Sequence, residues 1–296
     1  MTENLQNIQV QLLPDFSTDL VQVSILRLDL IHSVVSGNKW FKLKYYLKEA
    51  LDTGKKTIVS FGGAYSNHIV ATAFAAKEAG LHSRGIIRGD AGTALSPTLI
   101  TAKKYGMQLV FVNRDHYRNK EGIMQEYATD EDYWIMEGGY GIQGSIGASE
   151  ILGITDTTMY THILCAVGTG TMLSGLIRAA SPQQQLIGIS VLKNQFSISD
   201  ETTALLPDSV RPKHFSILHE YHFGGYAKHP PGLIHFMKET WYQSQVPTDI
   251  VYTSKLLFAA KDLITKGYFP SGSRILLIHS GGLQGNASLQ AGILPF

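Results

Sequence analysis

The sequence predicts an α/β protein, and two features of its 296 residues carry that prediction. From residue 39 onward, short β-branched runs alternate with stretches of helical periodicity. The β-branched runs are largely apolar, which is typical of parallel strands that are buried on both faces and joined by right-handed crossovers. Seven or more such strands fit either one wide sheet or two sheets in two domains, because no proline-rich or low-complexity linker separates them.

The strand candidates follow one another in a regular order. The first, residues 57–61, leads through a glycine-rich turn into a helix whose apolar positions include Ala71, Ala75 and Ala79. The other strand candidates are Arg84–Ile87, Gln108–Val112, Tyr133–Met136, His162–Val167, Leu186–Val191 and Arg274–His279. Residues 194–242 are rich in His, Pro and aromatic side chains and show no clear period, so no element is predicted there.

The composition argues against several classes of protein. A formal net charge of +1 gives no basic surface of the kind that binds nucleic acid or an anionic membrane. No window contains the roughly 20 apolar residues of a membrane span, and the first residues lack the basic and apolar regions of a secretory signal. The single cysteine, Cys165, lies in an apolar run and is expected to be a small buried hydrophobe. We therefore expect a cytoplasmic protein without nucleic-acid or membrane partners.

Lys39 lies in the first turn of a predicted helix that Ser36 or Asn38 could cap. A cation is unfavourable there because of the helix dipole. The dipole, with Lys42 and Lys44 nearby, would lower the pKa of the Lys39 amine from about 10.4 toward a nucleophilic value. The alternative, from these residues alone, is a solvated basic helix start.

Three turns rich in glycine and hydroxyl groups each follow a predicted strand. Residues 60–68 could bind a carboxylate or phosphate at a helix N-terminus, or could simply form a tight turn capped by Ser66 or Asn67. Residues 167–172 (Val-Gly-Thr-Gly-Thr-Met) suit a small fixed phosphate, since they lack the Gly-Lys-Thr/Ser ending of a nucleotide loop. Residues 279–282 follow the last strand, and ligands of open α/β sheets collect at the carboxyl ends of strands. We expect His279 to be a hydrogen-bonded core histidine, because no set of side chains has metal-ligand spacing.

Together these clusters resemble the family of 1-aminocyclopropane-1-carboxylate deaminase and D-cysteine desulfhydrase, among the fold-type II enzymes that use pyridoxal 5′-phosphate (PLP). The resemblance runs from about Arg27 to Gly282. Its motifs are Gly-Asn-Lys-x-x-Lys at residues 37–42, Gly-Gly-x-x-Ser-Asn-His at 62–68, the loop 168–171, Tyr252 and Ser-Gly-Gly at 280–282. It implies two open twisted, mainly parallel sheets flanked by helices, with PLP in the cleft between two domains.

The resemblance also implies a role for each matching residue. Lys39 falls on the Schiff-base lysine and would move the substrate Cα proton, and the other catalytic positions are Ser66, Tyr226 and Tyr252. The positions that would hold the cofactor are Lys39, Asn67, Gly168, Thr169, Gly170, Thr171, Thr253 and Ser280. The substrate carboxylate would bind Ser66, Asn67 and His68. The resemblance implies a large domain of residues 1–51 and 141–296, a small domain of residues 52–140, and a homodimer.

Two positions bear on the reaction. Deaminase members carry Glu after the tyrosine matched by Tyr252 and Leu before the late Gly-Gly pair, whereas this chain has Thr253 and Ser280. A hydroxyl leaves the ring nitrogen of PLP closer to neutral than a carboxylate does, which suffices to expel a good leaving group such as a thiolate. We therefore expect a small amino acid as substrate, with β-elimination from D-cysteine giving pyruvate, ammonia and sulfide.

Other functions stay open at this point. One is 1-aminocyclopropane-1-carboxylate deamination, and others are serine dehydration or racemisation on the same scaffold. A different class would be a non-catalytic protein that binds a phosphate-bearing ligand.

Overall fold

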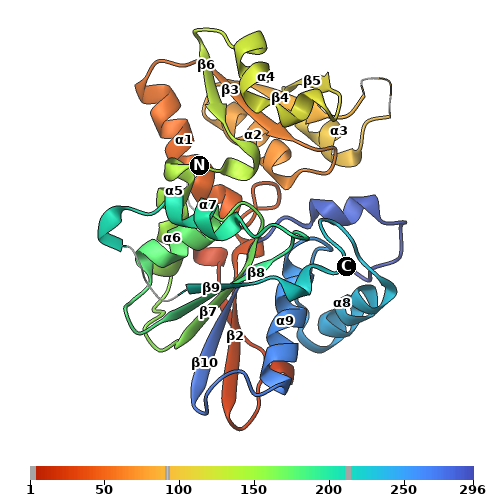
Figure 1. The fold of residues 1–296 in the computed structure, drawn as a ribbon. Coiled ribbons are helices and arrows are strands. Elements are labelled where there is room, and N and C mark those ends of the chain that lie inside the picture. Colours follow the sequence, from red (N-terminus) through yellow and green to blue (C-terminus); the bar gives the residue numbers. More distant parts are fainter. Residues whose placement is uncertain (1–4, 91, 93, 211–214) are drawn as a thin grey trace.

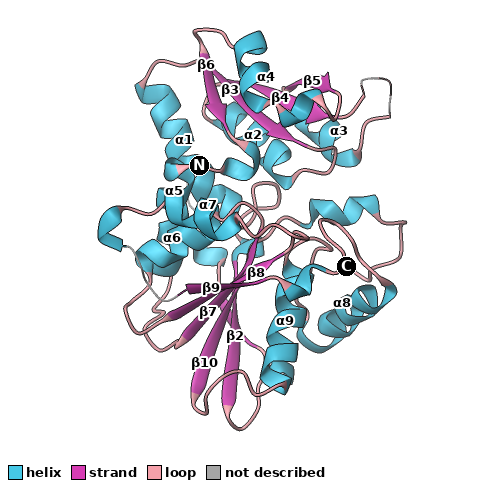
Figure 2. Ribbon diagram, viewed as in Figure 1, coloured by secondary structure: helices cyan, strands magenta, loops and turns pink. Residues whose placement is uncertain are grey.

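The computed structural model describes residues 5–90, 92, 94–210 and 215–296. It contains two separate sheets, one above the other in the view of Figure 1, with helices around and between them. Figure 2 shows the smaller sheet and the larger sheet as two distinct groups of strands. Of the two arrangements that the sequence allows, the structure has two sheets rather than one wide sheet.

The larger sheet has six strands, and five of its strands run parallel. The antiparallel exception is β1, which pairs with β2 at one edge. The order of strands is β1 (Val10–Leu12), β2 (Val21–Arg27), β10 (Ser273–His279), β7 (His162–Val167), β8 (Gln185–Ser190) and β9 (Phe215–Leu218). Strand β10 lies between β2 and β7, so the first and last thirds of the chain meet in the middle of this sheet.

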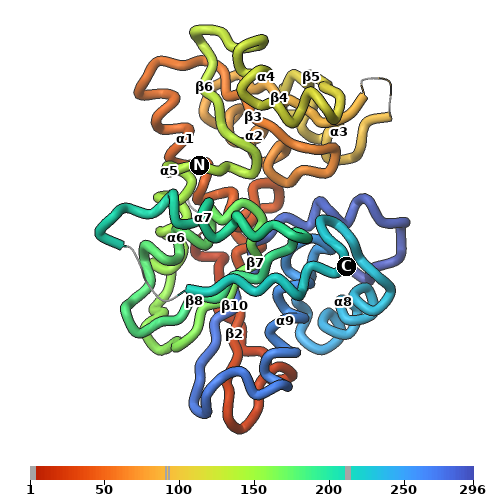
Figure 3. The backbone as a smooth tube through the Cα atoms, viewed as in Figure 1, coloured from red at the N-terminus to blue at the C-terminus, as the bar shows by residue number. Residues whose placement is uncertain are grey.

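The smaller sheet has four parallel strands. Their order is β5 (Gln108–Val112), β4 (His82–Arg88), β3 (Thr57–Gly62) and β6 (Asp132–Ile135). All four strands fall within residues 52–140, the segment predicted as the small domain, although the division into domains stays a prediction. The chain enters this sheet once from the larger one and returns once, as the tube in Figure 3 shows.

Nine α-helices connect the strands within the described ranges. They are α1 (Asn38–Asp52), α2 (Asn67–Glu78), α3 (Pro97–Lys104), α4 (Lys120–Tyr127), α5 (Ile142–Ser149), α6 (Thr171–Ala179), α7 (Ile198–Ala204), α8 (Pro231–Ser244) and α9 (Thr253–Thr265). Helices α1, α2, α5 and α6 share one hydrophobic core that also includes Ile58 of the small sheet and Ile163 of the large sheet. This continuous core packs the two sheets onto common helices. No helix in the part of the chain that the structure describes is long and apolar enough to cross a bilayer.

The seven predicted strands are all present, with bounds that differ from the prediction by at most two residues at either end. Strands β1, β2 and β9 were not predicted. The predicted cap of α1 is wrong: Gly37 occupies the cap position with φ 65°, and no side chain caps the helix. Ser36 instead accepts a hydrogen bond of 2.7 Å from the amide of Gly282, and the Asn38 amide donates to the carbonyl oxygen of Ser280.

Candidate active site

A cavity brings together residues from both halves of the chain. It is lined by the N-terminus of α1, the loops after β7 and β10, and single residues near the starts of α2 and α9. The residues that carry its polar and glycine surface are Ser36, Asn38, Lys39, Lys42, Asn67, Gly138, Gly168, Thr169, Gly170, Tyr252, Ser280, Gly281 and Gly282. The glycine- and hydroxyl-rich turns predicted to converge therefore all reach one cavity.

Lys39 faces this cavity from the first turn of α1. Its Nζ donates a hydrogen bond of 2.9 Å to Oδ1 of Asn38. Desolvation lowers the pKa of Lys39 to about 8, although the Asp249 carboxylate favours the charged amine. The direction agrees with the sequence prediction, but burial is the main cause. Lys44 does not contribute, because it lies at the surface in an ion pair of 2.9 Å with Glu150.

A second amine, that of Lys42, reaches the cavity from the same face of α1 and was not predicted as a site residue. Its side chain is buried, and Nζ donates to the carbonyl oxygen of Gly138 at 3.2 Å. Burial and the nearby Lys39 lower the pKa of Lys42 well below its ordinary value. The spacing of three residues between the two lysines was the available signal, since such residues are neighbours on a helix surface.

The turn before α2 contributes a cap and an amide. Ser66 caps α2 by accepting a hydrogen bond of 3.3 Å from the Ile69 amide, as the sequence suggested. Asn67 donates from Nδ2 to the Gly282 carbonyl oxygen at 2.7 Å. Its Oδ1 is buried and has no hydrogen-bond partner among the residues that the structure describes. Asn67 therefore lines the cavity with an acceptor that a ligand could use.

His68 lies behind this turn and does not line the cavity. Ser60 donates its hydroxyl proton to the Ile135 carbonyl oxygen, so the contact of 2.8 Å between Ser60 Oγ and His68 Nε2 has the histidine as donor. Nδ1 of His68 is then an acceptor, buried and without a partner in the described ranges. Burial, with Lys39 and Lys42 nearby, lowers the pKa of His68 well below its ordinary value, so the ring is neutral.

The loop between β7 and α6 forms a cradle for an anion. Gly170 caps α6 in a left-handed conformation with φ 74°, and a Cβ at this position would lie 2.3 Å from Oγ1 of Thr202. The hydroxyls of Thr169 and Thr171 lie 3.1 Å apart, although Thr171 itself is fully buried. Amides at a helix N-terminus attract phosphate, and the absence of side chains lets it approach closely.

Two tyrosines predicted to flank the substrate lie against each other. The rings of Tyr226 and Tyr252 meet edge to face, with centroids 6.2 Å apart. Tyr252 lines the cavity beside Gly168, whereas Tyr226 is 48% exposed. Desolvation and the Tyr226 hydroxyl raise the pKa of Tyr252 well above 10, so it remains a neutral phenol.

Lys255 supports the loop that carries Tyr226 and was not predicted. It is fully buried in α9, and its Nζ donates to the carbonyl oxygens of Gly225 at 2.8 Å and His222 at 3.0 Å. Burial lowers the pKa of Lys255 to about 8, against the effect of Asp249. The sequence offers no signal for this role, because the partners are backbone atoms 30 or more residues away.

Thr253 does not reach the cavity. It is fully buried, and its hydroxyl donates to Oδ1 of Asp249 at 2.7 Å and accepts from the Asp249 amide at 2.8 Å. Asp249 also accepts from the amides of Val251 and Tyr252, so this unpredicted carboxylate organises the start of α9. The available signal was an Asp four residues before the start of α9, a helix that was not itself predicted. Ser280, by contrast, lines the cavity.

The residues present fit PLP. The cavity holds an amine of lowered pKa in Lys39, and a glycine and threonine cradle at the N-terminus of α6. Across it lies the buried Asn67 Oδ1, which needs a partner. Covalent attachment, phosphate binding and a polar contact to the ring can thus be met in one place.

Comparison with known proteins points the same way. The model of the family described as pyridoxal-phosphate dependent enzyme matches residues 2–281. A solved structure titled as an analysis of "the ACC deaminase homologue" is similar with a TM-score of 0.81 and 27% identity, over 95% of this chain and 90% of that one.

Two named relatives cover most of the chain. One is the "Bifunctional D-cysteine desulfhydrase/1-aminocyclopropane-1-carboxylate deaminase, mitochondrial" of Arabidopsis thaliana, 26% identical over 88% of this chain and 72% of that protein. Another is the "D-cysteine desulfhydrase" of Klebsiella pneumoniae, 26% identical over 88% of this chain and 87% of that protein. The two mainly parallel sheets flanked by helices are the fold-type II arrangement that the resemblance implied. The chain belongs to the family of pyridoxal-phosphate-dependent enzymes.

Proposed function

We propose that the enzyme catalyses β-elimination from D-cysteine or a related β-substituted amino acid, with pyruvate, ammonia and sulfide as products from D-cysteine. One observation carries the proposal: Ser280 lines the cavity, and no described residue of the cavity lining is acidic. A carboxylate beside the ring nitrogen would keep that nitrogen protonated and strengthen electron withdrawal. A hydroxyl suits a reaction whose leaving group is already good, such as a thiolate.

The side chains divide the work as follows. Lys39 holds the cofactor and moves the proton at the substrate Cα, and its pKa of about 8 places a useful fraction of neutral amine near pH 7 to 8. The loop 168–171 holds the phosphate. The bound cofactor supplies the electron sink that stabilises negative charge at Cα. Ser280 is the partner of the ring nitrogen, a role that Thr253 cannot share because its proton is donated to Asp249.

The substrate lies between the start of α2 and the two tyrosines. The Ser66 hydroxyl and the free amides of Asn67 and His68 bind its carboxylate, as helix N-termini bind anions. Tyr252 lines the other side of the cavity, and Tyr226 packs edge to face against it. Both phenols stay protonated near neutral pH, so they act as hydrogen-bond donors rather than as bases.

The deciding experiment compares four substrates: D-cysteine, L-cysteine, D-serine and 1-aminocyclopropane-1-carboxylate. We expect pyruvate and sulfide in equal amounts from D-cysteine, with kcat/KM at least about tenfold above that for the other three, a discrimination that differential contacts in a small pocket can supply. No product from D-cysteine would overturn the proposal. Borohydride reduction followed by peptide mass spectrometry should place the pyridoxyl adduct on Lys39, and an adduct on Lys42 would reassign the lysine.

Deamination of 1-aminocyclopropane-1-carboxylate is the second candidate. It is favoured by the similarity to a structure titled as an ACC deaminase homologue and to a bifunctional relative. Release of a four-carbon 2-oxo acid without sulfide would identify this reaction. A non-catalytic phosphate-binding role, open from the sequence alone, is not supported, since the matching family consists of PLP-dependent enzymes.

A further inference from the structure

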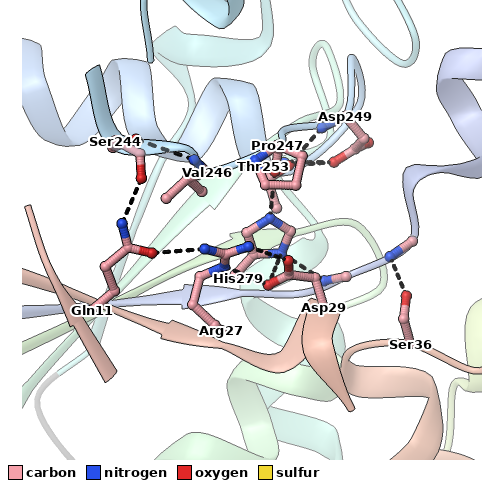
Figure 4. Close-up of polar contacts among 12 residues, drawn as sticks. Gln11, Arg27, Asp29, Ser36, Ser244, Val246, Pro247, Asp249, Thr253 and His279 are labelled. Atoms are coloured by element: carbon pink, nitrogen blue, oxygen red, sulfur yellow. Dashed lines mark hydrogen bonds and ion pairs between the residues drawn. The ribbon is translucent and has the colours of Figure 1, made fainter. Parts of the chain in front are cut away.

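His279 is the last residue of β10 and lies directly before the Ser280–Gly282 loop. It is fully buried and does not line the cavity. Its Nε2 lies 2.7 Å from the Pro247 carbonyl oxygen (Figure 4). Its Nδ1 lies 3.1 Å from the amide nitrogen of Gly281. Both ring nitrogens thus bind backbone groups, as expected for a hydrogen-bonded core histidine.

These partners determine where the ring carries its proton. A carbonyl oxygen only accepts, so Nε2 must donate to Pro247. A backbone amide only donates, so Nδ1 must present its lone pair to Gly281. Nε2 is therefore the donor of the His279 ring, and Nδ1 is its acceptor.

A buried ion pair lies beside this lone pair. Oδ1 of Asp29 is 3.5 Å from Nδ1 of His279. Arg27 binds both carboxylate oxygens of Asp29, at 2.9 Å and 2.7 Å, and so fixes the carboxylate in place. Gln11 in turn accepts from Arg27 at 2.7 Å and donates to the Ser244 carbonyl oxygen, so the guanidinium is itself fixed in place (Figure 4).

The loop that His279 supports is held by several hydrogen bonds, and His279 supplies the one to the Gly281 amide. Gly281 and Gly282 both adopt left-handed conformations, with φ of 67° and 75°. Asn38 binds the carbonyl oxygen of Ser280, and Ser36 binds the amide of Gly282. The amide between these two points, that of Gly281, is bound by His279. Rotation of that peptide would turn the Ser280 residue relative to the cavity.

We propose that His279 is a positioning residue: its Nδ1 lone pair fixes the Gly281 amide, and thereby the direction in which Ser280 faces the ring nitrogen of the cofactor. The inference rests on the proposed role of Ser280. Arg27 and Asp29 complete the unit, since the ion pair that they form packs against the nitrogen that Gly281 uses.

Two substitutions separate the two hydrogen bonds of the ring. In His279→Asn, the side-chain oxygen takes the position of Nδ1 and can still accept from Gly281, while the bond to Pro247 is lost. In His279→Gln, the amide nitrogen takes the position of Nε2 and can still donate to Pro247, while the acceptor for Gly281 is lost. Each variant loses one buried hydrogen bond, so each is the matched control of the other.

The readouts are the PLP dissociation constant of the apoenzyme and the visible absorption of the bound cofactor as a function of pH. We expect the Gln variant to bind PLP about tenfold more weakly and to shift the pH midpoint of the visible band. The Asn variant should stay within about threefold of the parent, with an unchanged midpoint. Equal effects of the two substitutions, or a larger effect of Asn, would overturn the proposal.

Two further measurements test the bond between His279 and Gly281 and the role of Ser280 independently of the Asn and Gln variants. If neither variant folds, hydrogen exchange of the Gly281 amide in the parent enzyme tests the bond to His279. We expect strong protection of this amide, and exchange as fast as that of exposed loops would contradict the bond.

Ser280→Ala separately tests the proposed contact between Ser280 and the ring nitrogen. If that variant leaves the visible band unchanged, the proposed role of Ser280 fails, and so does the inference drawn from it for the ring nitrogen. The Asn–Gln difference in PLP affinity would still report whether His279 shapes the cofactor site.

Discussion

The side-chain nitrogen of Asn67 donates a hydrogen bond of 2.7 Å to the carbonyl oxygen of Gly282, which lies 215 residues further along the chain. The bond joins the start of α2 to the loop after β10, so the two parts of the site hold each other. It also directs the remaining oxygen of the amide, which is buried and without a partner among the described residues. The direction in which this oxygen faces the cavity therefore depends on a contact between the start of α2 and the loop after β10.

Gly282→Ala should disrupt this contact. Gly282 has φ 75°, and an added Cβ would lie 2.3 Å from Nδ2 of Asn67. We expect the free energy of unfolding, measured with urea on the apoenzyme, to fall by about 2–4 kcal/mol from backbone strain and steric overlap together. Gly292→Ala is the matched control, since it has φ 81° and no atom within 4 Å of the added Cβ. Equal losses in the two variants would mean that the contact with Asn67 contributes nothing.

Capture of PLP by the apoenzyme should depend on pH through Lys39. Only the neutral amine attacks the cofactor, and desolvation lowers the pKa of Lys39 to about 8. The rate, followed by stopped-flow absorbance, should rise about tenfold per pH unit below pH 8 and level off above it. A solvated lysine would continue the rise to about pH 10.4. A tenfold increase between pH 9 and pH 10 would show that the amine is not desolvated.

Lys255→Met should change how stability depends on pH. In the folded protein burial lowers the pKa of Lys255 to about 8, from an ordinary value of 10.5. Between these values the unfolded chain binds more protons, so this group makes the free energy of unfolding rise with pH. The stability of the parent relative to the Met variant should therefore grow by about 1–3 kcal/mol from pH 8 to pH 10, measured by chemical denaturation. A constant difference would mean that Lys255 titrates normally.

Thr253→Val should change the stability of the protein, whereas Ser280→Ala should change the absorption of bound PLP. Loss of the Thr253 hydroxyl removes the hydrogen bond of 2.7 Å to the buried Asp249 carboxylate. We therefore expect a fall of about 1–3 kcal/mol in the free energy of unfolding. The visible band of bound PLP should not change. Ser280→Ala should change the band with little effect on stability, because Ser280 faces the cavity. A change of the visible band in the Thr253 variant would show that Thr253 does contact the cofactor.

The sequence predicted strands well where apolar runs are continuous and buried. Strand β7, buried at every position, has the predicted bounds for this reason. Strand β5 also has the predicted bounds, although only Val112 in it is buried. Strand β2 contains Gln22, Ser24 and Arg27, which obscure the apolar pattern. Arg27 is buried because Asp29 compensates its charge and Gln11 accepts a further hydrogen bond from it. Strand β9 has only four residues and lies at the sheet edge, where local periodicity is weak.

In the candidate site, too, local sequence patterns could be predicted, whereas most contacts between distant residues could not. Its motifs are local turns after strands, and parallel strands place such turns at one edge, so their convergence could be predicted. The supporting side chains could not, because the partners of Lys255 and His279 are backbone groups brought near only by the fold. Thr253 shows the converse, since its sequence position matched the site while its hydroxyl binds Asp249. The roles carried over from the resemblance and the homodimer stay predictions.

The parallel pairing of β2 with β10 also sets an order of events during biosynthesis. The strands of the smaller sheet lie within residues 57–135, so that sheet can form while the chain is still being made. Strand β2 must wait for a partner about 250 residues later, and pairings of such separation form slowly. Until β10 has left the ribosome, Gly37 and Asn38 lack the Ser280 backbone against which they pack in the folded protein. Lys39 is thus synthesised well before the residues that complete its surroundings.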